Sequence, residues 1–476
     1  MAKALRDTPW PVLLLVASFL SPTELSIYLG SARLPPHRAL LLLLLPVAIF
    51  ALLGRKGIRP KAFDLAFLGF AIWTVVVYLY HLGQADGLQT GGALALDSFA
   101  SFLVARAFVR DDRTFMATAG TLLLAVALAG LVALPEMLLG QTFVHDFLRQ
   151  VTGYVHPVGI EKRLGLTRAS GVFDHPIHMG TFCAGSLALA MYAARNDFGA
   201  GARTVVIAVS ALTSLSSAPM LSLAVQLGLV AFERATRGIK GRVPMAIGGL
   251  IVVFGAISMV ATRSPFAIIA TGFTLDSWTG YYRLMIWEHG LANVWNHPLM
   301  GIGLGDWERP QWMASSTVDA FWLVIAMKGG IPSFILLAAG IVLIGRGVGV
   351  RMRRCGQETR HIATGWMISL LALALVGCTV HYWNVPYAYF FFFLGLGGCF
   401  ADPLKKAASA QVKAAATKPA SRIRWLMPEA LPVGAAAVIP PARADWPVGP
   451  PRWPVPVSAA GAAARAPAPP AARGRR

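Results

Sequence analysis

The sequence predicts an all-α fold: a polytopic membrane bundle of about twelve transmembrane helices with a large loop on its outer side. Three observations predict it: 56% of residues are hydrophobic, only 13% are charged, and the apolar runs have the length that a helix needs to cross a bilayer. Lipid offers no partner to exposed backbone groups, so a span must be a helix or part of a closed barrel. Barrel strands would be about ten residues long with alternating polarity, so the runs favour helices.

Twelve apolar runs are predicted to be spans. In chain order they cover residues 11–29, 39–53, 63–80, 92–108, 115–134, 177–194, 204–215, 220–232, 243–261, 320–344, 362–380 and 387–400. The runs at 204–215 and 220–232 are short and meet at Ser-Ser-Ala-Pro (216–219). They are therefore either two helices or one long bent helix.

The charges of the short connections alternate along the chain. Lys and Arg occur in the connections at 55–61, 110–113, 195–203, 233–242 and 346–360, but not in those at 81–90 and 381–386. Short basic loops stay in the cytoplasm. Both termini are therefore expected there, and the two long loops, 135–176 and 262–318, face outward, into the periplasm if the cell is Gram-negative. The same rule explains the net charge of +20 without a nucleic-acid partner.

Residues 402–476 are rich in Ala, Pro and Arg and cannot bury a core. They are predicted to be a basic, disordered cytoplasmic tail that follows a membrane domain of residues 1–401. The cysteines are scattered without a ligand spacing, so neither a disulfide nor a metal site is expected. They are Cys183, Cys355, Cys378 and Cys399.

Arginines in the outer loops oppose the insertion bias and so need another explanation. Arg168 and Arg283 each lie close to the end of a predicted span. A guanidinium is always charged and its planar fork matches phosphate oxygens, so the two could hold a diphosphate at the outer face. The alternative is a helix-end anchor, or an ion pair with Asp174, Glu161 or Glu288.

Other polar side chains of these loops are candidates for acid–base chemistry. Asp319 opens a span and is either a general base, a ligand for an acceptor hydroxyl, or a helix N-cap. His175, His178 and His289 are candidates for hydrogen bonding or proton transfer. A metal site is disfavoured, because Pro176 interrupts the first two histidines and no second cluster completes a ligand set.

Gly301, Gly303 and Gly305 form a GxGxG that follows no predicted strand, which disfavours a dinucleotide site. A tight turn, where the backbone packs closely or meets a sugar, is the better interpretation. Among the acids of the apolar runs, Asp97 is the most internal and is predicted to make an interhelical contact.

Two segments resemble the O-antigen ligase and polysaccharide polymerase superfamily. The first is RASGVFDHPIHMG (168–180). The second combines Arg283, Trp287, HPLMGIGLGDW (297–307), a polar residue that opens a span, and Lys-Gly-Gly-Ile (328–331). The resemblance covers roughly residues 10–400 and agrees in order, spacing and topology.

The resemblance implies an integral-membrane glycosyltransferase with a GT-C-like helical fold in the bacterial inner membrane. Such enzymes take a glycan from a polyprenyl diphosphate on the periplasmic face, without a nucleotide sugar and typically without a metal, so no cofactor is expected. The implied partners are the polyprenyl-diphosphate-linked oligosaccharide, membrane lipids and other polysaccharide assembly proteins. The arginines that contact the diphosphate correspond to Arg168 and Arg283. Asp174, Trp287 and the three glycines are expected to contact substrate.

In ligases of this superfamily, a histidine after the loop is proposed to activate the lipid A–core hydroxyl. Asp319 takes that position here, which favours a polymerase that joins lipid-linked repeat units of an exopolysaccharide or O-antigen. Asp319, His175 or His289 would take the acceptor proton. The alternatives are an O-antigen ligase and, from another class, a glycolipid flippase. A flippase would usually show inverted repeats and polar sites at the midplane, for which the sequence gives no clear sign.

Overall fold

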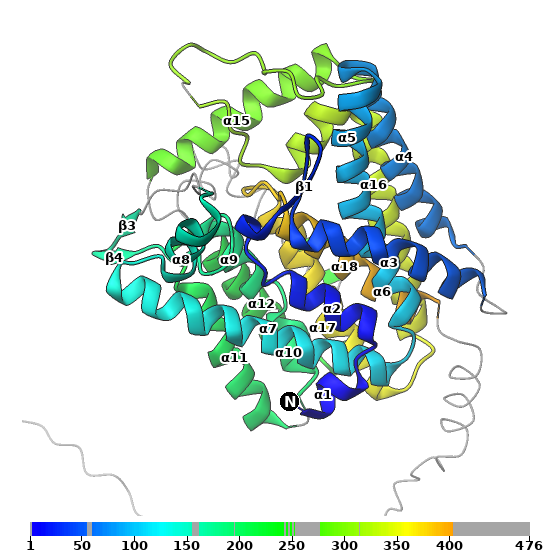
Figure 1. Cartoon of the computed structure of the whole chain (residues 1–476). Helices are drawn as coiled ribbons and strands as arrows, with labels where there is room; N and C mark the ends of the chain where they lie inside the picture. Colours follow the sequence, from blue (N-terminus) through cyan, green and yellow to red (C-terminus); the bar gives the residue numbers. More distant parts are fainter. Residues whose placement is uncertain are drawn as a thin grey trace, which may run out of the picture. The chain divides into compact units, whose positions relative to one another are not determined.

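The computed structural model describes residues 2–54, 60–154, 161–194, 196–241, 277–313 and 315–402, with a few further positions between 244 and 252. The described chain is mostly helical (Figure 1). Its helices are α1 (Ala2–Asp7), α2 (Trp10–Ser18), the 3-10 turn η1 (Thr23–Leu25), α3 (Pro36–Leu53), α4 (Ala62–Leu82), α5 (Gln84–Ala95), the π-helical turn η2 (Leu96–Ala100), α6 (Ser101–Phe108), α7 (Asp112–Leu139), α8 (Phe143–Thr152), α9 (Pro176–Ala184), α10 (Leu187–Tyr192), α11 (Asp197–Leu212), α12 (Ser217–Ala235), α15 (Ser277–Asn296), α16 (Phe321–Met352), α17 (Gln357–Val376), α18 (Val385–Leu396) and α19 (Gly398–Ala401). Two short antiparallel hairpins pair β1 (Ile27–Leu29) with β2 (Ala32–Leu34) and β3 (Lys162–Arg163) with β4 (Leu166–Thr167).

Six of the described helices are long and apolar enough to cross a membrane. They are α3, α4, the continuous helix Gln84–Phe108, α7, α16 and α17. A shorter apolar segment, Val385–Ala401, comprises α18 and α19. The prediction of a helical, multi-pass membrane protein is confirmed at this level. The predicted span at 243–261 falls largely outside the described residues, as does the predicted tail.

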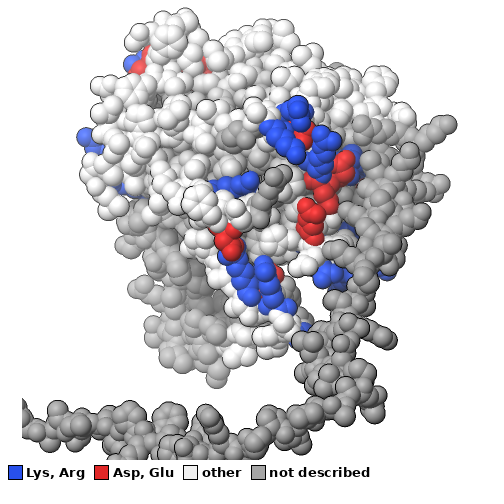
Figure 2. Space-filling model, turned by 90° about the horizontal axis from the view of Figure 1, so that it is seen from below, with Lys and Arg blue, Asp and Glu red and all other residues white. Residues whose placement is uncertain are grey.

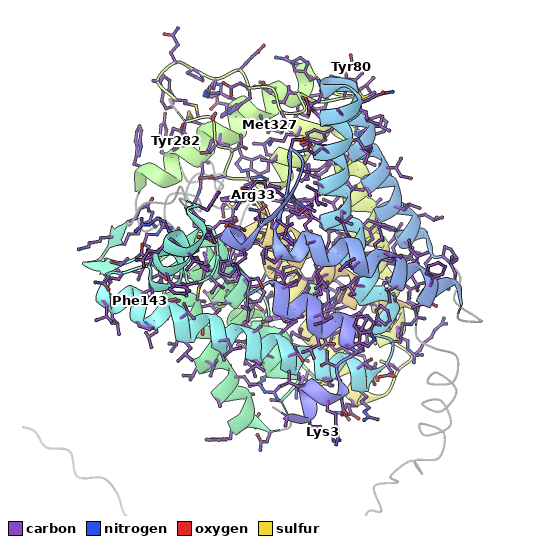
Figure 3. All side chains as sticks on the ribbon, viewed as in Figure 1. Lys3, Arg33, Tyr80, Phe143, Tyr282 and Met327 are labelled. Atoms are coloured by element: carbon purple, nitrogen blue, oxygen red, sulfur yellow. The ribbon has the colours of Figure 1, made fainter. Side chains whose placement is uncertain are left out.

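The first predicted span, 11–29, is wrong. α2 ends at Ser18, and the chain then passes through η1 into the hairpin β1–β2. Pro22 explains the break, because it has no N–H to donate and restricts the residue before it. Arg33, labelled in Figure 3, belongs to the hairpin. It donates a hydrogen bond of 2.7 Å to the hydroxyl of Tyr154 and lies over the ring of that residue. The hairpin β1–β2 is therefore a folded segment that Arg33 attaches to the region after α8.

The predicted loop 135–176 is also folded, because it holds the end of α7, all of α8 and the hairpin β3–β4. α8 is amphipathic. On one side His145 is buried, and its Nδ1 lies 2.5 Å from a carboxylate oxygen of Glu24. On the other side Phe147 and Val151 are 62% and 67% exposed. A polar buried pair therefore fixes α8 to the body of the protein, and its apolar side faces outward.

The predicted span 177–194 forms two helices, α9 and α10, that are joined by a buried side chain. Gln226 of α12 donates to the carbonyl of Ala184 (2.7 Å) and accepts from the N–H of Ala188 (2.9 Å). These two backbone groups lie at the end of α9 and the start of α10, where intrahelical partners are missing. The alternatives left open for 204–232 are also resolved: this stretch forms two helices, α11 and α12.

α18 is the centre of the apolar core. Every residue from Val385 to Leu396 is buried, and α18 packs against α6, η2, α9 and α17 (Figure 1). A helix that is apolar on all sides is stable only when neighbours surround it. Gly395 permits the closest approach, because a Cβ there would overlap the backbone of Phe102 in α6.

The predicted interhelical contact of Asp97 is confirmed. Asp97 lies in the π-helical turn η2 and is 1% exposed. Arg38 of α3 donates to both of its carboxylate oxygens, from Nε at 3.0 Å and from Nη2 at 2.5 Å. A bidentate pair offsets much of the cost of burying both charges.

Figure 2 shows the end of the bundle that carries α1, where Lys and Arg side chains lie beside Asp and Glu. The buried Arg106 joins three segments here, because it donates to Asp64 (3.0 Å) and to Asp402 (2.7 Å). The charge pattern of the sequence predicts that this end faces the cytoplasm.

The predicted loop 262–318 contains the helix α15. Its buried residues Ile286 and Val294 pack in one cluster with Leu323 and Met327 of α16. Tyr282 of α15 and Met327 of α16 mark this region in Figure 3. The loop is thus attached to the N-terminal part of α16 by a small apolar core of its own.

The GxGxG turn repairs a break in α16. At Gly330 the backbone leaves the helical region (φ 73°), and Pro332 has no N–H. The carbonyls of Met327 and Lys328 therefore lose their usual helical partners. They accept instead from the N–H groups of Ile302 (2.8 Å) and Gly303 (3.1 Å). We call this arrangement the glycine clamp.

Replacing Gly330 with alanine is expected to lower the stability of the protein by at least about 2 kcal/mol, because its φ of 73° and ψ of 176° suit glycine alone and a Cβ would meet the backbone of Leu299. Gly349→Ala is the matched control: Gly349 lies in the same helix with open space around its Cβ position, so this change is expected to be neutral or slightly stabilising. Thermal unfolding in detergent measures both. Equal midpoints for the two variants would contradict the clamp.

Candidate functional site

Arg168 is placed by the short segment between β4 and α9. Its side chain donates to the hydroxyl of Ser216 (2.9 Å), to the carbonyl of Ser214 (3.4 Å) and to the carboxylate of Glu161. It is 5% exposed. Burial and the neighbouring charge of Arg163 lower its pKa, and Glu161 opposes this effect. The side chain of Arg168 is thus fixed against the turn between α11 and α12.

Glu136, near the end of α7, holds the backbone beside Arg168. It accepts from the N–H of Ser170 (2.8 Å), from the hydroxyl of Ser170 (3.1 Å) and from the N–H of Gly171 (2.8 Å). It is 1% exposed. The carboxylate thus satisfies two backbone donors that lie outside any helix or strand. It is a positioning residue for the Arg168 segment.

Arg283 on α15 is buried in a different way. It is 8% exposed, yet it makes no hydrogen bond or ion pair with any residue that the structure describes, and its Nε is buried without a partner. Burial and the nearby charges of Arg163 and Arg168 lower its pKa, against the attraction of Asp319. A buried charge without a partner is costly, so such groups are uncommon unless a ligand completes them.

These side chains meet in one cavity of about 190 Å³, which we call the arginine cavity. Its charged and polar lining consists of Glu161, Arg163, Arg168, His175, Ser216, Ser217, Arg283 and Asp319. Three guanidinium groups face two carboxylates, so the cavity carries an excess of positive charge. Three converging guanidinium groups are suited to a ligand that carries several negative oxygens, such as a diphosphate.

Asp319 lies at the edge of the arginine cavity. Burial raises the pKa of its carboxyl group, and the positive charge of Arg283 partly offsets this. The N-cap interpretation is wrong: the N-cap position of α16 is Ala320, and no side chain caps it. Asp319 also lines a second, larger cavity of about 630 Å³, bounded by residues 302–309 and 316–319 and by α16, which we call the loop cavity. It is the residue that the two cavities share.

His175 lines the arginine cavity and caps α9. Its Nδ1 accepts from the N–H of Ile177 (3.1 Å), so His175 is the N-cap of this helix. In the neutral ring the proton is then on Nε2. That nitrogen can donate a hydrogen bond, whereas the basic nitrogen, Nδ1, is already occupied by the N–H of Ile177. This geometry favours an anion-orienting role for His175 over that of a base.

The structure places several other predicted residues outside the arginine cavity. Asp174 joins two distant segments, accepting from Thr23 (2.5 Å) and Asn384 (2.6 Å). Trp287 donates to the carbonyl of Cys378 (2.9 Å) and anchors α15. Neither residue lines the arginine cavity, and their predicted contacts with substrate stay predictions. His289, on the same helix, lines none of the cavities described here.

The three glycines of the GxGxG turn lie in two different environments. Gly301 and Gly303 have positive φ angles of 60° and 59° and belong to the glycine clamp, where added Cβ atoms would meet Lys328 and His81. Neither of them lines the arginine cavity or the loop cavity, and their predicted contact with substrate stays a prediction. Gly305 lines the loop cavity.

Sequence reasoning missed Arg163 and Glu136 as members of the site. Arg163 shares the signal that identified Arg168, since both are arginines in a loop that the sequence predicts to face outward. Glu136 lies beside Pro135 at the end of an apolar run, where an acid is usually read as snorkelling towards the interface. Among the described residues, no group of three or more His, Cys, Asp or Glu side chains is arranged to hold a metal ion.

No protein-family model matches the chain, and no curated protein matches its sequence.

Proposed function

We propose that this protein is a membrane polysaccharide polymerase, with a GT-C-like fold of about twelve membrane helices in the bacterial inner membrane and with both termini in the cytoplasm. It transfers a lipid-diphosphate-linked glycan onto another lipid-linked repeat unit. One observation carries the proposal: Arg168, Arg283 and Asp319, which come from three separate segments, line a single cavity with a positive excess.

In the proposed reaction, an acceptor hydroxyl attacks the anomeric carbon of the donor glycan. The bond from that carbon to the diphosphate oxygen breaks, and the electron pair leaves with the diphosphate. Arg283, which has no partner among the described residues, together with Arg168 would stabilise the charge that grows on this leaving group. Asp319 takes the proton of the hydroxyl. Its place between the arginine cavity and the loop cavity supports this role, because donor and acceptor would meet there.

Two other functions remain as alternatives. An O-antigen ligase would use the same donor site but transfer the glycan to lipid A–core, and Asp at position 319 is the feature that favours a polymerase. A glycolipid flippase would need a path between the leaflets. The arginine cavity lies beside α15 and the segment between β4 and α9, away from the basic end of the bundle, which favours an enzyme.

The experiment is incubation of the purified protein with a synthetic polyprenyl-diphosphate repeat unit. The proposal predicts a ladder of lipid-linked products. Transfer that requires added lipid A–core would indicate a ligase. Movement of the glycolipid between leaflets of a vesicle without any new bond would indicate a flippase, and either result would contradict a polymerase.

A further inference from the structure

Lys328 is a cation that the proposed reaction does not use. It lies about two turns into the membrane-length helix α16, where a charged side chain is costly and usually functional. It makes no side-chain hydrogen bond or ion pair with any residue that the structure describes. Its backbone is fixed, because its carbonyl accepts from Gly303 in the glycine clamp. The lysine therefore lies two residues before the break of α16 at Gly330, where the glycine clamp supplies the missing hydrogen-bond donors.

Lys328 lies where two cavities of different character adjoin. One is the loop cavity, which is lined both by apolar residues and by charged and hydroxyl-bearing side chains. The other, of about 130 Å³, lies among α4, α5, α16 and α18 and is lined by rings such as Phe70, Tyr78 and Tyr387, so we call it the aromatic cavity. The two share Val324, Lys328, His381 and Trp383. A charged group thus lies between a space of mixed polarity and a mainly apolar one.

The other cations of these cavities are already neutralised. Arg38 in the aromatic cavity forms the bidentate pair with Asp97. Arg309 in the loop cavity lies 2.5 Å from Asp306. Among the described residues, Lys328 is the lining cation that lacks such a partner. Asp319 shares the loop cavity with Lys328, but the two form no ion pair.

His381 lines the same two cavities as Lys328. Its Nδ1 is buried and has no hydrogen-bond partner among the described residues, and its backbone carbonyl lies 3.3 Å from Nε2 of His178. Burial and the charge of Lys328 lower the pKa of His381 to about 3, so the ring stays neutral. A neutral imidazole can donate one hydrogen bond to an anion beside the ammonium group of Lys328.

We propose that Lys328 and His381 form a second anion-binding site, which takes the phosphate head group of an amphiphile whose apolar part enters the aromatic cavity. The position between a cavity with several charged and hydroxyl-bearing groups and a mainly apolar cavity matches the two ends of such a molecule. If the ligand is the acceptor, a second lipid-linked repeat unit, that identification rests on the proposed function. The binding itself does not.

Native mass spectrometry of the full-length protein, titrated with geranylgeranyl phosphate, tests the site. The wild-type protein is expected to bind two molecules, one at Lys328 and one in the arginine cavity. Lys328→Met is expected to weaken one of the two by about 10- to 100-fold, because a charge-assisted hydrogen bond is lost. Lys328→Arg should retain binding, and Lys3→Met, at an exposed lysine, is the control. Geranylgeraniol should bind weakly and be insensitive to the substitutions at position 328.

The two proposals fail separately. If Lys328→Met keeps both molecules while Arg283→Met loses one, the second site is refuted and the donor site stands. If Lys328→Met loses one and Arg283→Met loses none, the second site stands and the donor site is refuted. Inorganic phosphate that binds as tightly as geranylgeranyl phosphate would overturn the assignment to an amphiphile. Should Lys328→Met fail to fold, Lys328→Gln replaces it in the same titration.

Discussion

Replacing Arg283 with methionine is expected to reduce glycan transfer by about 10²- to 10³-fold, the usual effect of removing one donor that stabilises charge in a transition state. The same change should leave the thermal midpoint unchanged or raise it. Arg283 is 8% exposed and has no hydrogen bond or ion pair among the described residues, so methionine removes a buried charge without breaking a contact.

This opposite movement of activity and stability distinguishes a ligand-binding arginine from a structural one. Arg168→Met provides the comparison, because Arg168 donates to Ser216, Ser214 and Glu161 and should lose both activity and stability. Arg353→Met, at an exposed basic position, is the control for loss of charge alone. A large fall in the midpoint of Arg283→Met with full transfer per folded molecule would contradict the account.

Replacing Asp319 with asparagine is expected to cause the second large loss of glycan transfer. Loss of a general base typically reduces the rate by about 10²- to 10⁴-fold. Burial raises the pKa of Asp319, so its charged form is disfavoured and activity should fall as the pH drops through a value above the ordinary aspartate range. In Asp319→Asn this acidic limb of the pH profile should vanish along with most of the rate. Asp319→Glu should keep the limb with a lower rate.

The charge of Arg283 sets the position of that limb. Arg283 lowers the pKa of Asp319, so removing it should raise the pKa further. As the pH is lowered, the residual activity of Arg283→Met is then expected to decline at a higher pH than the activity of the wild type. Rates measured between about pH 4 and pH 8 test this, because that range spans the ordinary Asp and His pKa values. An unchanged limb would place the titrating group elsewhere.

The same pKa has a consequence for stability. A carboxyl group whose pKa is raised on folding destabilises the protein at pH values above its unfolded pKa, where folding must bury its charge. Asp319→Asn should therefore be at least as stable as the wild type at neutral pH, although it is inactive. That combination excludes misfolding as the reason for lost activity.

Much of the helical architecture could be predicted from hydropathy, because lipid leaves few choices for an apolar run. The runs at 39–53, 63–80 and 115–134 correspond closely to α3, α4 and α7. The run at 11–29 failed because its apolar residues include the strand β1, and hydropathy does not distinguish three exposed strand residues from part of a helix. Pro22 was the local signal.

The candidate site could also be predicted only in part from the sequence. Arg168, Arg283, His175 and Asp319 were predicted from residue type and from their position in outer loops, and they share one cavity. Asp174 and Trp287 occur in the same motifs, but their partners are Asn384 and a backbone carbonyl far along the chain. Only the folded structure shows which motif residues face the cavity and which hold the segments together. That Arg38 is paired with Asp97, and that Lys328 has no ion-pair partner in the described part of the chain, likewise depends on tertiary neighbours.

The central claim is that Arg168 and Arg283 together bind the diphosphate of the donor. The most direct test is the affinity of the purified full-length protein for geranylgeranyl diphosphate, measured for the wild type, for the double variant Arg168→Met/Arg283→Met, and for Arg353→Met as the control. The account predicts that the double variant binds at least about 100-fold more weakly, since charge-assisted bonds from two guanidinium groups are lost, and that the control is unchanged. Equal affinity for the wild type and the double variant would contradict it.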